Sequence, residues 1–320
     1  MADAEPTETP AIAGTVRAVF AALRPHQWVK NLLVLVPLAG AHRLGSPNDL
    51  LRVLVAFVAF GCVASGVYVL NDLLDVADDR LHPRKRNRPF ASGALSITTG
   101  HLLWPATTLV GLGLAFAVLP PAFLVVLVGY FLLTLAYSFR LKRIPMVDVV
   151  ALAALYTARL VGGAFAVPVP LSFWLTIFSV FLFTSLAFVK RYAELVAAKA
   201  AEQGETGEVR VLPGRGYATT DLPVVGALGA ASGYIAVLVF ALYIQDPVTA
   251  TLYRTPRLLW IGCPVLLYWV SRIWLVTARG TMHDDPVVFA IRDRASWVVG
   301  AVLAATVALA DKVVLTGWGR

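Results

Sequence analysis

The chain has 320 residues, of which 58% are hydrophobic and 14% are charged, and its formal net charge is +8. Soluble domains carry about 25% charged residues, so this composition excludes a soluble globular protein. The positive charge requires no nucleic-acid partner, because anionic lipid headgroups attract Lys and Arg at a membrane surface. We therefore expect membrane lipids, and no nucleic acid, around this chain.

The N-terminal stretch is acidic and polar and shows no signal peptide. It reads "MADAEPTETPAIAGT", a composition that cannot bury enough apolar surface to order itself. We expect a disordered cytoplasmic tail over residues 1–20, followed by a single transmembrane catalytic domain over residues 21–320.

Apolar windows long enough to cross a bilayer, which takes about 20 residues, recur along the rest of the chain. We predict an all-α, polytopic membrane protein with nine transmembrane helices. The predicted spans lie near residues 24–42, 51–74, 100–119, 121–139, 146–166, 171–192, 222–244, 258–278 and 296–316.

The basic residues predict the orientation of these spans. If the N-terminus is cytoplasmic, the tail and the loops after spans 2, 4, 6 and 8 hold most of the 27 Lys and Arg residues. Cytoplasmic loops carry such an excess. We therefore expect a bacterial inner-membrane protein with a cytoplasmic N-terminus and a cytoplasmic active site.

An acid-rich stretch closes the second span. Asp72, Asp75 and Asp79 are spaced i, i+3 and i+7, which places them on one helical face, and Asn71 lies beside Asp72. One interpretation is a helix end in the headgroup layer whose acids are solvated and paired with Arg84, Lys85 or Arg86. The other is a divalent-metal site, because carboxylate oxygens suit Mg²⁺.

Three stretches resemble the UbiA superfamily of intramembrane prenyltransferases over about residues 20 to 316. The acids form Asn71-Asp72-x-x-Asp75-x-x-x-Asp79, which is similar to the family's first aspartate-rich motif. "KRNRPFASG" (85–93) resembles the segment that follows it, and "RPHQWVKN" (24–31) resembles the opening signature. The resemblance implies a helical bundle around a central cavity. It also implies Mg²⁺ held by Asp72, Asp75 and Asp79, with a diphosphate bound to it.

The chain departs from the family pattern after the sixth span. "FVKRYAELVAAK" (188–199) places Lys190, Arg191 and Glu194 where a second aspartate-rich motif is expected. Lys190 and Glu194 are one turn apart and could simply pair. Together with "RPHQWVKN", the basic form resembles the branch that contains decaprenyl-phosphate phosphoribosyltransferase. That resemblance implies catalytic roles for Asp72, Asp75, Lys190 and Arg191.

Further polar residues are candidates for substrate binding at the same cavity. Arg159 falls in the middle of a predicted span, where a charge costs about 3 kcal/mol or more, so it either faces the cavity or pairs with a carboxylate. Arg292, in "RDR" (292–294), either reaches the site or belongs to a helix cap. The full predicted set is Lys30, Asn71, Arg84, Lys85, Tyr137, Lys142, Arg143, Arg159, Glu194 and Arg292.

The branch resemblance implies a Mg²⁺-dependent enzyme that transfers a 5-phosphoribosyl group from phosphoribosyl diphosphate to a polyprenyl phosphate. Two alternatives stay open: an aromatic prenyltransferase with an isoprenyl diphosphate donor, and a non-catalytic lipid carrier or transporter. A homo-oligomer is compatible with each of these three functions. The stretches "GRGY" (214–217) and "MHDD" (282–285) have no assigned role in these readings.

Overall fold

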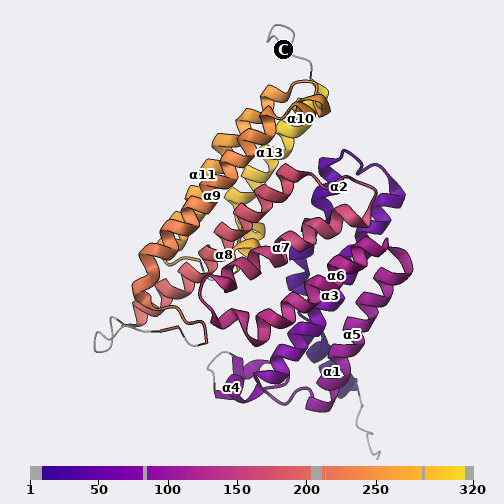
Figure 1. Ribbon diagram of the computed structural model, residues 1–320. Helices are drawn as coiled ribbons and strands as arrows, with labels where there is room; N and C mark the ends of the chain where they lie inside the picture. The colour runs from indigo at the N-terminus through magenta and orange to yellow at the C-terminus, as the bar shows by residue number, and fades with distance from the viewer. Residues whose placement is uncertain (1–8, 82–84, 203–210, 213, 283–284, 314–320) are drawn as a thin grey trace, which may run out of the picture. The chain divides into compact units, whose positions relative to one another are not determined.

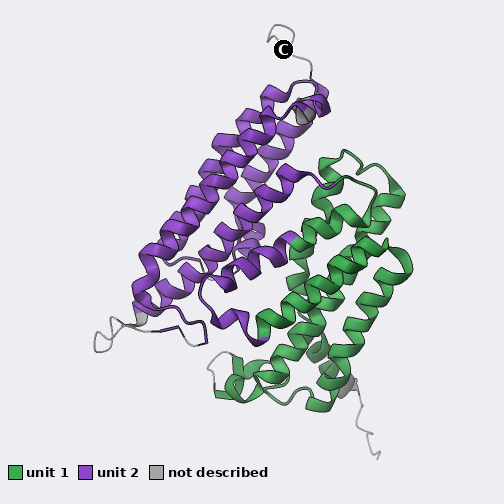
Figure 2. Cartoon of the chain, in the orientation of Figure 1, with its two compact units in different colours: residues 1–138, 158–170 green, residues 139–157, 171–320 purple. Residues whose placement is uncertain are grey.

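A computed structural model of the chain describes residues 9–81, 85–202, 211–212, 214–282 and 285–313. These residues form helices and no β-strand, apart from one isolated bridge between Val211 and Ala218. The helices form two compact units, residues 1–138 with 158–170 and residues 139–157 with 171–320 (Figure 2). The predicted all-α class is confirmed.

Unit 1 contains the first six α-helices and the C-terminal half of the seventh (Figure 1). Its elements are α1 (Thr9–Leu23), the 3₁₀ helix η1 (Pro25–Leu35), α2 (Val36–Gly40), α3 (Pro47–Leu74), α4 (Val76–Leu81), η2 (Lys85–Asn87), α5 (Ile97–Val118) and α6 (Pro121–Phe139).

Unit 2 begins at the end of α6 and includes the first half of α7 (Val147–Ala166). Its other elements are η3 (Leu141–Arg143), α8 (Phe173–Glu202), η4 (Thr219–Asp221), α9 (Leu222–Gln245), α10 (Pro247–Leu252), η5 (Pro256–Ile261), α11 (Gly262–Ala278), α12 (Pro286–Arg292) and α13 (Arg294–Lys312).

Among the described residues, eight helices are long and apolar enough to cross a membrane. They correspond to the eight predicted spans from residue 51 onward, and the chain is an integral membrane protein. The predicted span 24–42 is helical as well, but it is divided between η1 and the one-turn α2. Pro37 has no backbone N–H to donate and lies in the first turn of α2, a position at which a helix tolerates proline.

The prediction of a disordered tail over residues 1–20 is wrong for residues 9–20, which form most of α1. Residues 1–8 lie outside the described part of the chain. Ala18 and Ala22 of α1 are buried in an apolar cluster with Val69, Phe90 and Leu95. Burial of Ala18 and Ala22 against these side chains stabilises α1. The composition of the first fifteen residues alone gave no sign of this packing.

Hydrogen bonds and close packing attach η1 to the helices of unit 1. The indole of Trp28 donates to Ser65 (2.9 Å), and the Ser65 hydroxyl donates to the carbonyl of Leu23 (2.6 Å). A Cβ added at Gly163 of α7 would overlap the carbonyl of Val34 in η1. Glycine at position 163 therefore permits the close approach of α7 and η1.

Small residues play the same role in unit 2. The Ser185 hydroxyl of α8 donates to the carbonyl of Gly229 in α9 (2.7 Å) and accepts from the Trp274 indole of α11 (3.1 Å). A Cβ at Gly229 would overlap the Trp274 ring. The spacing of Gly229 and Gly233 thus reflects helix packing inside the chain.

Gly163→Ala is expected to lower thermal stability in detergent, because the added methyl group meets backbone atoms that cannot rotate away. Overpacking of this kind costs about 1–3 kcal/mol. Gly129→Ala in α6 is the matched control, since no atom lies within 4 Å of its added Cβ and alanine favours a helix by about 1 kcal/mol. Equal melting temperatures for the two variants would contradict this account.

Candidate functional site

The acid-rich stretch spans the junction of α3 and α4. Asp72 lies in the last turn of α3, Asp75 caps that helix, and Asp79 lies in α4. The amides of Asp75 and Asp79 donate to the carbonyls of Asn71 (3.0 Å) and Asp75 (2.8 Å), so helical spacing continues across the junction. Asp72 and Asp79 are each only 2% exposed, whereas Asn71 and Asp75 are half-buried.

Two arginines neutralise the buried carboxylates. Arg24 Nη2 lies 2.6 Å from Asp72 Oδ1, while Arg88 Nη1 contacts both Asp72 Oδ1 (3.1 Å) and Asp79 Oδ2 (2.7 Å). Because one nitrogen touches both side chains, Asp72 and Asp79 converge on a common point. The pairing partners suggested by the sequence were different: Lys85 and Arg86 are exposed, and Arg84 lies outside the described residues.

The backbone explains how both arginines reach the acids. Arg24 adopts a left-handed conformation (φ 51°) at the end of α1, next to the Leu23 carbonyl that Ser65 holds. Arg88 lies two residues before Phe90, which is 1% exposed and anchored in the apolar cluster with α1. Arg24 belongs to "RPHQWVKN" and Arg88 to "KRNRPFASG", two of the stretches that resemble the UbiA superfamily. A buried carboxylate needs a cation as its partner, and this requirement could have identified both arginines from the sequence.

The acidic cluster fits a hard cation. Asp72 Oδ2 is buried and has no hydrogen-bond partner, which leaves one carboxylate oxygen for an additional ligand. The described residues include no group of three or more His, Cys, Asp or Glu arranged as a complete metal cage. Mg²⁺ is usually bound by one or two carboxylates, waters and substrate phosphates, so such a cage is not required.

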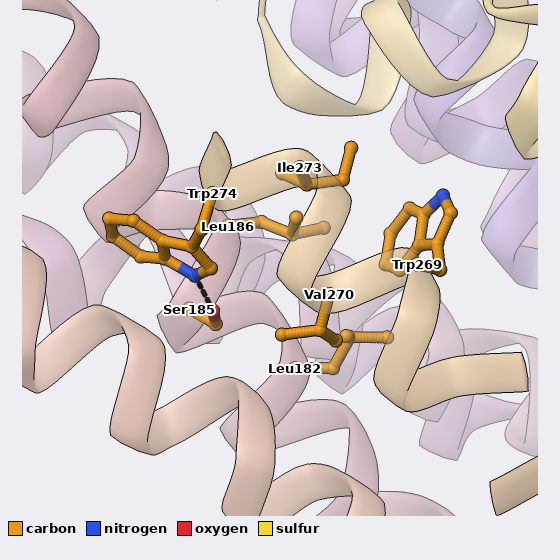
Figure 3. A pocket seen from close by; sticks show the side chains of 7 residues that line it. All are labelled: Leu182, Ser185, Leu186, Trp269, Val270, Ile273 and Trp274. Atoms are coloured by element: carbon orange, nitrogen blue, oxygen red, sulfur yellow. Dashed lines mark hydrogen bonds between the residues drawn. The ribbon is translucent and has the colours of Figure 1, made fainter. Parts of the chain in front are cut away.

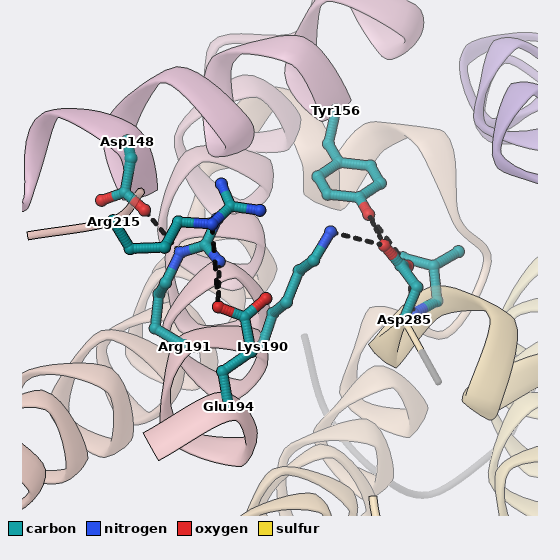
Figure 4. Close-up of polar contacts among 8 residues, drawn as sticks. Asp148, Tyr156, Lys190, Arg191, Glu194, Arg215 and Asp285 are labelled. Carbon is teal, nitrogen blue, oxygen red and sulfur yellow. Dashed lines mark hydrogen bonds and ion pairs between the residues drawn. The ribbon is translucent and has the colours of Figure 1, made fainter. Parts of the chain in front are cut away.

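The second motif forms a buried ion-pair network in unit 2 (Figure 4). Arg191 is fully buried, its Nε donates to Asp148 Oδ2, and its Nη1 donates to Glu194 Oε2. Glu194 therefore pairs with Arg191 and, at 4.0 Å, with Arg215, and the alternative pair of Glu194 with Lys190 is not formed. Arg191 acts within the protein in this structure, and its direct contact with a substrate stays a prediction.

Lys190 points to a different carboxylate. Its Nζ lies 3.7 Å from Asp285 Oδ2, and its side chain is 32% exposed. Asp285 also accepts from the Tyr156 hydroxyl at 3.0 Å and caps α12 through the amide of Val287 at 3.2 Å. Asp285 thus gives "MHDD" a structural role at its last position, while His283 and Asp284 lie outside the described residues.

Arg159 is held by neutral groups of unit 1. Its Nε donates to Asn31 Oδ1 (2.9 Å), its Nη2 donates to the Tyr130 hydroxyl (2.8 Å), and its guanidinium carbon lies 4.7 Å from the Tyr130 ring centroid. These contacts, including the cation–π contact, offset part of the cost of a charge at membrane depth. None of these three contacts is the pair with a carboxylate that was considered from the sequence.

The other candidates differ in exposure. Lys30 is 9% exposed in η1, Tyr137 and Lys142 are half-buried, and Arg143 and Arg292 are exposed. In "RDR", it is Asp293 that caps α13, through the Ser296 amide at 2.8 Å. Burial would raise the pKa of Asp293, but hydrogen bonds from Arg272 and Ser296 lower it, so the cap stays ionised.

Unit 2 also has an apolar pocket between α8 and α11 (Figure 3). Figure 3 shows the side chains of Trp269, Val270, Ile273 and Trp274 facing Leu182, Ser185 and Leu186. Its lining side chains fill it almost completely, and two of them, Trp274 and Ser185, are hydrogen-bonded to each other. This pocket is a packing feature and offers no place for a phosphorylated substrate.

Arg191→Met is expected to lower the free energy of unfolding by about 3–5 kcal/mol, because Asp148 would be left buried without its cation. Lys190→Ala removes a partly exposed contact and should cost less than about 1 kcal/mol. Thermal unfolding of both variants in the same detergent measures the difference. A larger loss for Lys190→Ala would show that the buried network does not stabilise unit 2.

Comparisons with known proteins agree with the resemblance. The model of the UbiA prenyltransferase family matches residues 32–297. A solved structure of a UbiA homologue from Archaeoglobus fulgidus, bound to DMAPP and Mg²⁺, is similar with a TM-score of 0.66 and 16% identity, over 91% of this chain and 99% of that one. At this identity the likeness shows the fold.

Three relatives are more similar in sequence. The uncharacterized protein y4nM of Sinorhizobium fredii is 37% identical over 95% of this chain, which spans 58% of that protein. The nodulation protein NoeC of Azorhizobium caulinodans is 37% identical over 87% of this chain and 88% of its own. The decaprenyl-phosphate phosphoribosyltransferase of Mycobacterium tuberculosis is 33% identical over 95% of this chain and 97% of its own.

Proposed function

The chain belongs to the UbiA prenyltransferase family, and on this premise we propose that it is a Mg²⁺-dependent polyprenyl-phosphate phosphoribosyltransferase. Its substrates would be phosphoribosyl diphosphate and a polyprenyl phosphate of the bacterial inner membrane. The observation that carries the proposal is the basic motif at residues 190–191, where the family pattern has acids. The similarity to decaprenyl-phosphate phosphoribosyltransferase along nearly its whole length supports it.

The acidic cluster is assigned to the metal. Asp72 and Asp79 converge on Arg88, and Asp72 keeps one oxygen without a partner. These two carboxylates would hold Mg²⁺, and Asp75 stays a predicted third ligand. The bound ion would neutralise the diphosphate leaving group. Arg24 and Arg88 balance the charge of the carboxylates in the protein alone.

The basic residues of unit 2 are assigned to phosphate groups. Lys190, Lys142 and Arg143 retain solvent-exposed surface, so each can reach a ligand. The donor carries a 5-phosphate in addition to its diphosphate, and charge-assisted hydrogen bonds from Lys and Arg bind such groups. An isoprenyl diphosphate lacks this third phosphate, and a prenyltransferase would have less use for these cations.

The chemistry needs no strong general base. The phosphate oxygen of the lipid is already anionic at neutral pH, and it attacks C1 of the ribose as the C1–O bond to diphosphate breaks. Positioning of the two substrates and neutralisation of charge supply most of the rate acceleration. With a cytoplasmic N-terminus, this reaction would take place at the cytoplasmic face.

A second candidate function is prenyl transfer. Its support is the similarity to UbiA homologues whose structures contain DMAPP or GPP with Mg²⁺. The two functions share the metal and differ in the donor, so donor choice separates them.

Membranes that contain the protein are expected to convert polyprenyl phosphate to a phosphoribosylated lipid when given Mg²⁺ and phosphoribosyl diphosphate, as detected by mass spectrometry. Asp72→Ala should abolish the product, because it removes a carboxylate of the metal site. Asp78→Asn is the matched control, since Asp78 is exposed in α4. A prenylated product from an isoprenyl diphosphate, with no phosphoribosylated lipid, would establish the second candidate instead.

Lys190→Ala should weaken binding of phosphoribosyl diphosphate about ten- to a hundredfold, which corresponds to the loss of one charge-assisted contact of roughly 1.5–3 kcal/mol. Inorganic diphosphate should be affected less, because it lacks the 5-phosphate. Competition binding in detergent measures both ligands on one variant. Equal losses would assign Lys190 to the diphosphate, and no loss would limit Lys190 to its pair with Asp285.

A further inference from the structure

Tyr217, the last residue of "GRGY", is a buried hydrogen-bonding centre in unit 2. Its side chain has no exposed surface, and it packs in an apolar cluster with Val149, Leu195 and Leu212. Its hydroxyl accepts from the amide of Met146 (2.7 Å) and donates to Asp148 Oδ1 (2.7 Å). Burial raises the pKa of Tyr217 well above its usual value, so the hydroxyl keeps the proton it donates.

The Asp148 carboxylate that binds Tyr217 also binds Arg191 of the basic motif at residues 190–191. Asp148 has no exposed surface, its Oδ1 is taken by Tyr217, and its Oδ2 is taken by Arg191. The Asp148 side chain therefore connects Tyr217 to Arg191 of α8, which directly follows Lys190 in the chain. Through the Met146 amide it is also connected to the turn that follows Lys142 and Arg143.

This turn has an unusual backbone. Met146 adopts a left-handed conformation (φ 67°), which costs a non-glycine residue about 1–2 kcal/mol. Strain of this kind persists where surrounding contacts impose it, and it gathers at functional sites. The Tyr217 hydroxyl is one of the contacts that imposes it.

Gly216 brings its own backbone against the same turn. It is left-handed (φ 73°), and a Cβ at this position would lie 2.8 Å from the Arg143 carbonyl and 3.1 Å from Pro145 Cδ. Gly214 is also left-handed (φ 70°), but a Cβ there would meet no atom within 4 Å. The two glycines thus share a backbone requirement and differ in what they touch.

We propose that Tyr217 is a positioning residue for donor binding. Its hydroxyl fixes the Lys142–Arg143 segment through Met146 and the Lys190–Arg191 segment through Asp148, so the cations of both segments are held in one arrangement. The identity of the donor rests on the proposed function. The connection itself rests on contacts within unit 2.

The first test is Tyr217→Phe, which keeps the buried ring and removes only the hydroxyl. The KM for phosphoribosyl diphosphate should rise about three- to tenfold, the change expected from the loss of a hydrogen bond, while the KM for polyprenyl phosphate stays the same. Tyr253→Phe is the matched control, because Tyr253 is also buried in unit 2 and its hydroxyl lies 3.4 Å from that of Tyr243. This control should keep both KM values.

The second test needs no donor. Hydrogen–deuterium exchange should be faster over residues 143–148 in Tyr217→Phe than in the wild-type protein, because the Met146 amide loses its acceptor. Tyr253→Phe should leave this segment unchanged. Gly216→Ala should raise the donor KM, whereas Gly214→Ala, with similar backbone strain, should not.

The outcomes separate this inference from the proposed function. Unchanged exchange over residues 143–148 in Tyr217→Phe would overturn the connection. Faster exchange with an unchanged donor KM, or the same KM change in Tyr253→Phe, would overturn the positioning role. If the wild-type protein binds no phosphoribosyl diphosphate, the proposed function falls and the donor role falls with it, while the exchange measurement still decides whether the connection exists.

Discussion

A buried carboxylate in an apolar helical protein needs a cation close to it, and this constraint recurs in both units. In unit 1, Arg24 and Arg88 neutralise Asp72 and Asp79. In unit 2, Arg191 pairs with Asp148 and Glu194, and Arg215 lies 4.0 Å from Glu194. Removing one member of such a set leaves an uncompensated charge, which is much more costly than losing an exposed pair. The positions of these side chains are therefore fixed by electrostatics as much as by packing.

The two clusters solve the problem differently, and the difference bears on function. The cluster at Asp72 leaves one carboxylate oxygen without a hydrogen-bond partner, so its own arginines do not satisfy it completely. At Asp148, Tyr217 and Arg191 take one oxygen each. An incompletely satisfied buried carboxylate suits a cation that arrives with its substrate, and a satisfied one suits a permanent scaffold.

Much of the fold could be predicted from sequence because membrane helices leave a strong hydropathy pattern. This pattern predicted eight spans. The acidic motif was predicted separately, from the spacing of Asp72, Asp75 and Asp79. The break of residues 24–42 into η1 and α2, and the helix over residues 9–20, depend on tertiary packing against Ser65, Phe90 and their neighbours. The partners of Asp72, Asp148 and Glu194 were not predictable, since ion pairs between distant segments are determined by the three-dimensional arrangement. Lys190 and Glu194 show the limit: their helical spacing favours a pair, but Arg191 takes the glutamate.

The contacts of Tyr217 place a constraint on the length of the turn that carries it. The turn from Leu212 to Tyr217 is closed by a hydrogen bond from the Leu212 amide to the Tyr217 carbonyl (2.7 Å), so its length determines where the hydroxyl falls. Insertion or deletion of one residue there would carry the phenol away from Met146 and Asp148, while many replacements at exposed positions would not. Connecting loops usually tolerate insertions and deletions, but the length of this turn is fixed by the two groups that the Tyr217 hydroxyl must reach.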